Sequence, residues 1–96
     1  MPLYIFARLE PLPGNELQVR DELLRVLEPT RAEPGCLRIN IYESTRDAVV
    51  YFIHSQWTGE PAFDAHVNLP HTQHFAGAVE PLLVQPLKAV RTNQIA

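Results

Sequence analysis

Nine prolines divide this chain of 96 residues into short segments, and they limit what it can fold into. Proline fixes φ and has no amide hydrogen, so it is tolerated at helix starts and sheet edges but rarely in their interiors. Most helices and strands must therefore begin or end near a proline. A chain of this length forms one domain, which we expect to span residues 1–96.

The strongest periodic signal predicts an amphipathic helix that begins at Asn15 and is ended by Glu33-Pro34-Gly35. Asn15 and Gln18 form a capping-box pattern at its start, and Pro29 is predicted to kink or loosen its last turn. The apolar residues of this segment occupy about half of a helical wheel. They are Leu17, Val19, Leu23, Leu24, Val26 and Leu27.

The remaining segments predict four strands and two further helices. The strands are expected at 3–10, 36–44, 48–57 and 87–94, where apolar and β-branched residues are enriched. One helix is expected over 58–67 with Thr58 as its cap, and the next begins at Pro70. The order βαββααβ predicts an α+β, ferredoxin-like fold, with one antiparallel sheet and helices on one face.

Such a fold leaves the other face of the sheet uncovered. Strand alternation places four aromatic residues there: Tyr4, Phe6, Tyr42 and Phe52. Because an exposed aromatic face is unfavourable in water, we expect a homodimer that packs sheet against sheet, a dimeric α/β barrel. The alternative is a monomer that tolerates these aromatics at its surface.

Composition excludes several kinds of partner and compartment. A net charge of −3 argues against binding to nucleic acid or to an anionic membrane. No apolar run reaches the ~18 residues of a membrane-spanning helix, and the N-terminus lacks the pattern of a secretory signal. With Cys36 as the single cysteine, no internal disulfide is possible, so we expect a cytoplasmic protein.

Residues 63–75 hold three of the four histidines. Helical spacing turns His66 and His71 toward the apolar side, where an imidazole can act as a general base near neutral pH. The alternative is that both are core or capping histidines bonded to backbone carbonyls. His66, His71 and His74, with Asp64 or Glu60, also offer metal ligands, but Pro70 interrupts the helix, so we expect no metal site.

A ligand pocket is expected between the helices and the sheet. Arg38 is a further candidate, either as an anchor for an anionic substrate or in an ion pair. No glycine-rich phosphate loop, Gly-x-Ser-x-Gly elbow or Cys-x-x-Cys motif is present, so we expect no nucleotide, flavin or other cofactor. The candidate wall residues are Ile5, Tyr51, Trp57, Phe63 and Phe75.

A series of short motifs is similar to the antibiotic biosynthesis monooxygenase domain family. The motifs are Glu33-Pro34-Gly35-Cys36-Leu37-Arg38, Tyr42-Glu43-Ser44, Trp57, Ala62-Phe63-Asp64-Ala65-His66 and Pro70-His71. This resemblance implies a dimeric α+β barrel and a cofactor-free monooxygenase that oxidises a quinol or phenolic aromatic with dioxygen. Haem degradation is not expected, because the residues that the haem-degrading branch needs would fall at Ala7 and near Ala76.

Two other functions remain open from the sequence. The same scaffold could be an isomerase or lyase for a carbonyl compound or a phosphorylated signal compound, with Arg8, Arg38 or His74 binding the anion. It could also be a dimer that binds a ligand without catalysis. In the monooxygenase hypothesis, His66 or His71 is the base, and the pocket supplies a dry cavity and orientation.

Overall fold

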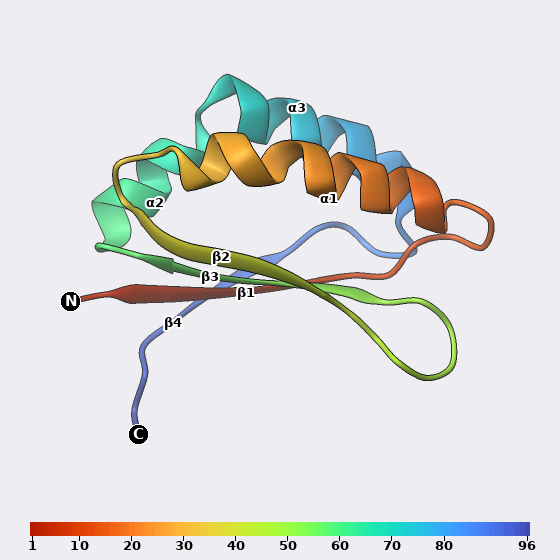
Figure 1. Ribbon diagram of the computed structural model, residues 1–96, viewed down its shortest axis with the longest axis horizontal. Coiled ribbons are helices and arrows are strands. Elements are labelled where there is room, and N and C mark those ends of the chain that lie inside the picture. The colour runs from red at the N-terminus through yellow and green to blue at the C-terminus, as the bar shows by residue number, and fades with distance from the viewer.

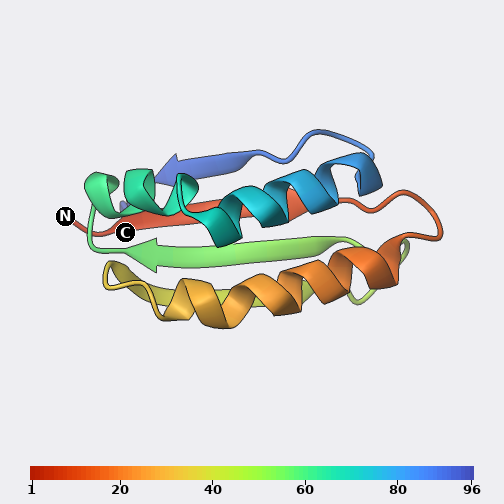
Figure 2. The ribbon, with the colours of Figure 1, turned by 90° about the horizontal axis from the view of Figure 1, so that it is seen from above.

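A four-stranded antiparallel sheet carries helices on one face only, as the computed structural model of residues 1–96 shows (Figure 1). The strand order is β2-β3-β1-β4, and α1 and α3 lie side by side above the sheet (Figure 2). The α+β ferredoxin-like prediction is therefore confirmed. The elements are β1 (Leu3–Leu9), α1 (Glu16–Arg31), β2 (Cys36–Glu43), β3 (Tyr51–Trp57), α2 (Glu60–Val67), α3 (Pro70–Val79), a 3₁₀ turn (Glu80–Leu82) and β4 (Ala89–Thr92).

The core lies between α1, α3 and the inner face of the sheet. Strand β1 buries alternate residues, and α1 buries one stripe at intervals of three or four residues, as the two periodicities require. The predicted helix face was too wide, because Leu17 and Leu24 are 73% and 53% exposed. The buried residues of these two elements are Leu3, Ile5, Ala7, Leu9, Val19, Leu23, Val26 and Thr30.

The helices begin and end close to the predicted residues, but two predicted caps were wrong. Asn15 precedes α1 but makes no side-chain cap; instead the Gly14 amide donates to Glu16 Oε1 over 3.0 Å. The helix runs through the exposed Pro29 to Arg31 and ends before Glu33-Pro34-Gly35, as predicted. Gly59, not Thr58, precedes α2.

Two strands are shorter than predicted. β3 begins at Tyr51 rather than at residue 48, and β4 covers only residues 89–92. β4 is an edge strand that pairs with β1 alone, so it has hydrogen-bond partners on one side only. Its short length also limits how much unpaired edge the sheet exposes.

The sheet face opposite the helices carries the four aromatics predicted there. Phe6, Tyr42 and Phe52 are 50%, 52% and 41% exposed, and Tyr4 is partly buried. His54 lies among them, with its ring stacked on Phe6 at 4.8 Å between centroids. None of the helices has the length and apolar character needed to cross a membrane.

Candidate functional site

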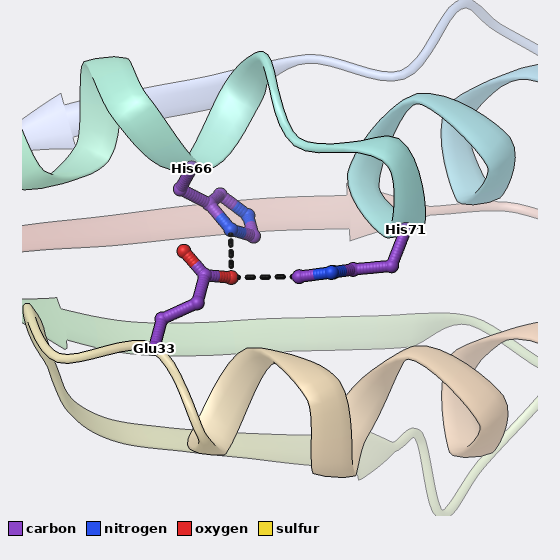
Figure 3. Close-up of side chains that lie close together, drawn as sticks. All are labelled: Glu33, His66 and His71. Carbon is purple, nitrogen blue, oxygen red and sulfur yellow. Dashed lines mark hydrogen bonds and ion pairs between the residues drawn. The ribbon is translucent and has the colours of Figure 1, made fainter.

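Glu33, His66 and His71 meet above the sheet, beside the start of α3 (Figure 3). A single carboxylate oxygen, Glu33 Oε2, accepts hydrogen bonds from His66 Nδ1 at 2.7 Å and from His71 Nε2 at 2.8 Å. A carboxylate can only accept, so both of these ring nitrogens carry hydrogen. The arrangement therefore fixes the tautomers: His66 keeps its lone pair on Nε2, and His71 keeps its lone pair on Nδ1.

Three separate elements bring these side chains together. Glu33 lies in the turn after α1, His66 in the last turn of α2 and His71 in the first turn of α3. The Gln73 amide group donates to the Val67 carbonyl at 2.6 Å and so holds the break between α2 and α3 closed. The two histidines consequently face the same carboxylate although a helix end separates them.

Gly35 allows the turn that carries Glu33 to approach α2. A Cβ at this position would overlap the Cβ of Ala62 and would stand 3.5 Å from its Cα. The Gly35 carbonyl also accepts a hydrogen bond from the Thr58 amide at 3.0 Å. Because Gly35 has no side chain, the turn that carries Glu33 can lie close to α2, the helix that bears His66.

An apolar pocket of about 290 Å³ lies between the helices and the sheet, and His66 forms part of its wall. The imidazole packs against Trp57, with 4.6 Å between ring centroids, and against Phe63 at 5.4 Å. No lysine, arginine, aspartate or glutamate lines this pocket. Its buried polar groups pair with each other: Trp57 Nε1, for example, donates to Ser55 Oγ at 3.0 Å.

The structure brings most of the predicted wall residues together. Ile5, Trp57, Phe63 and Phe75 line the pocket together with His66. His71 does not line the pocket. It is connected to His66, which does, through the shared Glu33 carboxylate. The next residue, Thr72, lines the pocket, and its Oγ1 lies 3.2 Å from His66 Nδ1.

Two predicted substrate-binding residues lie elsewhere. Tyr51 is at the opposite end of β3 from Trp57, about 20 Å away along the strand. Its hydroxyl donates to the Glu16 carbonyl at 3.2 Å, and burial followed by the charge of Glu43 raises its pKa. Arg38 is exposed on edge strand β2, next to the buried Ile39, so alternation directs it away from the pocket.

The histidine set considered for a metal is also different in the fold. The side chain of His74 is 70% exposed, outside the cluster. Glu60 and Asp64 both bind Arg91, at 2.5 and 2.8 Å, and neither touches a histidine. The third member of the cluster is Glu33, which the analysis of spacing missed.

One sequence signal could have identified Glu33. It follows the C-terminus of α1, where the helix dipole disfavours a negative charge. The side chain of Glu33 is nonetheless only 9% exposed. Its partners were not obvious from the sequence, because a histidine, unlike a lysine or an arginine, does not carry a permanent positive charge. An acid in such a position needs a local partner, and the two imidazoles supply it.

Cys36 begins β2, three residues beyond Glu33, and is partly buried. Burial, and then the charge of Glu33, raises the pKa of its thiol. Since the thiolate is the reactive form, this environment favours a packing role over a nucleophilic one.

A larger hollow of about 770 Å³ lies on the uncovered sheet face, on the opposite side from His66 and His71, and His54 is part of its lining. It is more polar at its rim, where Arg8, Glu10 and Lys88 stand around Phe6 and Phe52. This hollow contains none of the Glu33, His66 and His71 side chains, so we place the candidate site in the smaller pocket.

Comparison with known proteins gives consistent matches. The family model described as "Antibiotic biosynthesis monooxygenase" matches residues 2–78. Rv0793 of Mycobacterium tuberculosis, which is provisionally named a monooxygenase, is 31% identical over 86 residues, covering 90% of this chain and 84% of that protein. Its solved structure superposes with a TM-score of 0.93, 28% identity and coverage of 100% and 97%. PA3566 of Pseudomonas aeruginosa gives a TM-score of 0.89, 28% identity and coverage of 99% and 95%.

Proposed function

This chain belongs to the antibiotic biosynthesis monooxygenase family, and from that premise we propose that it is a cofactor-independent monooxygenase that oxidises a quinol or other phenolic aromatic with dioxygen. One observation carries the proposal. His66 stands in the wall of an apolar pocket while a mostly buried carboxylate, Glu33, holds its Nδ1.

His66 is the proposed general base. Glu33 accepts the Nδ1 hydrogen, so the lone pair is on Nε2, and the carboxylate stabilises the imidazolium that forms when Nε2 takes a proton. His71 donates to the same oxygen of Glu33 and thereby orients the carboxylate. In this proposal His66 is catalytic, and Glu33 and His71 are positioning residues.

The size and polarity of the pocket support a neutral aromatic of about two fused rings. Its 290 Å³ is about twice the ~150 Å³ of a cavity that accommodates benzene. Because no charged side chain lines it, it offers nothing to a phosphate or carboxylate. The isomerase or lyase alternative would need such an anchor, and Arg8, Arg38 and His74 all lie outside the pocket.

The reaction needs no electron donor beyond the substrate. His66 removes one hydroxyl proton, and the resulting anion passes an electron to dioxygen in the apolar pocket. The radical pair forms a carbon–oxygen bond, and the peroxide oxygen–oxygen bond then breaks. One oxygen atom stays on the ring, the other leaves as water, and a quinol with dioxygen gives a hydroxylated quinone and one water.

The uncovered sheet face supports a homodimer. Three aromatic side chains and Val90, which is 46% exposed, form an apolar surface that a second copy would cover. Sheet-to-sheet packing would also leave the pocket beneath the helices free. We further expect a reducing, cytoplasmic environment, because Cys36 is unpaired.

Oxygen consumption with 1,4-naphthoquinol tests the proposal. We expect His66→Ala to lower kcat by about 10²-fold or more, the usual contribution of a general base. His71→Ala should retain more activity than His66→Ala, because it only orients Glu33. His74→Ala is the matched control, since its side chain is 70% exposed, and should leave the rate unchanged.

Two results would refute the base assignment. One is an unchanged rate in His66→Ala, after correction for the uncatalysed oxidation of the quinol. The other is equal loss in His74→Ala, which would indicate a general effect of removing a histidine. A pH profile of kcat/KM adds a readout, because removing a general base should remove the rise in rate with pH that general-base catalysis produces.

A further inference from the structure

Three ligand atoms from three different elements converge on one point in this fold. They are Glu33 Oε2, His66 Nδ1 and His71 Nε2, and all lie within 4.8 Å of one another. We propose that these three side chains form a binding site for one divalent transition-metal ion, with Zn²⁺ as the representative ion. Binding there would switch off the base that the monooxygenase proposal needs.

The three ligand atoms can surround an ion after rotation of their side chains. Zinc binds imidazole nitrogen and carboxylate oxygen at about 2.0–2.2 Å, so neighbouring ligands of a tetrahedral site stand roughly 3.3 Å apart. The oxygen of Glu33 is now 2.7 and 2.8 Å from the two nitrogens. The two ring nitrogens lie up to 4.8 Å apart. An ion would therefore require the Glu33 carboxylate to withdraw by about half an ångström and the two rings to turn toward each other until their nitrogens stand roughly 3.3 Å apart.

The donor set favours a transition metal over Mg²⁺ or Ca²⁺. Two imidazoles and one carboxylate suit Zn²⁺, Co²⁺ or Ni²⁺, whereas Mg²⁺ and Ca²⁺ prefer sites made entirely of oxygen. Three protein ligands leave a fourth position open for water, as in exchangeable zinc sites. Pro70, which argued against a histidine site on one continuous helix, does not prevent this site, because His66 and His71 reach the same Glu33 oxygen from the two sides of the helix break.

Charge and burial also fit a cation. The side chain of Glu33 is 9% exposed, and its two hydrogen-bond partners are both imidazoles, so no lysine or arginine neutralises it. The side chains of His66 and His71 are 13% and 26% exposed, which leaves an approach to the site on the His71 side. A divalent ion would offset the buried negative charge directly.

Occupancy would change the tautomer of His66. A metal on Nδ1 requires the lone pair at that nitrogen, so the ring hydrogen moves to Nε2. In the metal-free site Nε2 carries the lone pair, which is the proposed base. Zn²⁺ should therefore inhibit oxidation without entering the apolar pocket. This inhibition rests on the proposed function, whereas the binding itself does not.

Calorimetric titration of untagged, chelator-treated full-length protein with Zn²⁺ tests the site. We expect one ion per chain, with Glu33→Gln and His71→Asn each weakening binding by about 10-fold or more. Co²⁺ should give the intense visible absorption of a tetrahedral site, and both variants should abolish it. His74→Ala should bind as the unchanged protein does. Mg²⁺ and Ca²⁺ should give no heat.

The possible outcomes separate the two proposals. Absence of stoichiometric Zn²⁺ binding, or equal affinity in both folded variants and the unchanged protein, overturns the metal site. Circular dichroism confirms folding, and having two variants on two elements keeps the test valid if one of them unfolds. If Zn²⁺ binds but naphthoquinol is not oxidised, the monooxygenase proposal fails and the metal site stands. If both hold, the midpoint of inhibition should match the dissociation constant.

Discussion

Gly35→Ala should destabilise the protein by crowding the contact between the turn before β2 and helix α2. The added Cβ would overlap Ala62 Cβ, whereas carbon atoms pack best at about 3.5–4.0 Å, and its 3.4 Å distance to Thr58 Oγ1 would be an ordinary contact. Gly35 is not in the left-handed region, so the substitution adds no backbone strain. The whole effect is therefore steric, and the turn or α2 must move.

Overpacking of this kind costs about 1–3 kcal/mol. For a domain of this size each kcal/mol lowers Tm by about 4–8 °C, so we expect a fall of roughly 4–24 °C. Thermal unfolding followed by circular dichroism measures it, at one protein concentration because a dimer would make Tm concentration-dependent. Activity should fall as well, since α2 carries His66 and a shift of about 1 Å can cost 10²-fold.

Two further variants test the cause. Ala62→Gly alone costs about 0.5–1 kcal/mol, but combined with Gly35→Ala it should recover part of the stability, because it removes the overlapping methyl group. Gly77→Ala is the matched control: its Cβ would meet nothing within 4 Å, so it should be neutral or stabilising. The steric argument is refuted if Gly35→Ala is as stable as the unchanged protein, or if the double variant loses the sum of both single losses.

Cys36, Phe52 and Tyr51 each give a further prediction. The raised pKa of Cys36 should make its alkylation near pH 8 slower than that of a free thiol, and Glu33→Gln should accelerate it. Phe52→Glu should shift sedimentation velocity toward the monomer, and a persistent dimer would exclude this face as the interface. Folding raises the pKa of Tyr51, so the folded protein holds the phenol proton more tightly than the unfolded chain does. The contribution of Tyr51 to the free energy of unfolding is therefore present below pH ~10 and is lost as the pH rises above that value. Urea unfolding from pH 8 to 11 should show this loss, and Tyr51→Phe should remove it.

Periodicity was enough to predict the fold because each element buries one regular face. The alternation in β1 identified Leu3, Ile5 and Leu9 as core, and the spacing in α1 identified Val19 and Leu23. Element ends were less predictable, because they depend on local contacts. At the start of α1, for instance, the Gly14 amide donates to the Glu16 side chain, and the Asn15 side chain makes no capping hydrogen bond.

The pocket was partly predictable for the same reason. Phe63 and Phe75 share the inward faces of their helices, and Ile5 and Trp57 point to the inner face of the sheet. Alternation also turns Tyr51 inward, but it says nothing of position along the strand. Tyr51 pairs with Leu9 at the end of the sheet away from the pocket, and only the register of β1 with β3 fixes that.

The role of Glu33 depends on its contacts with His66 and His71, which lie 33 and 38 positions further along the chain. No local sequence pattern encodes contacts at such separations. What the sequence contains is the means of making those contacts: Gly35, which permits close approach, and Pro70, which begins α3 after the break that follows Val67. The cluster is therefore a product of two packing events, the turn against α2 and α3 against α1. It follows that substitutions that leave all three cluster residues in place can still disable the site, and that Gly35→Ala is the most direct of them.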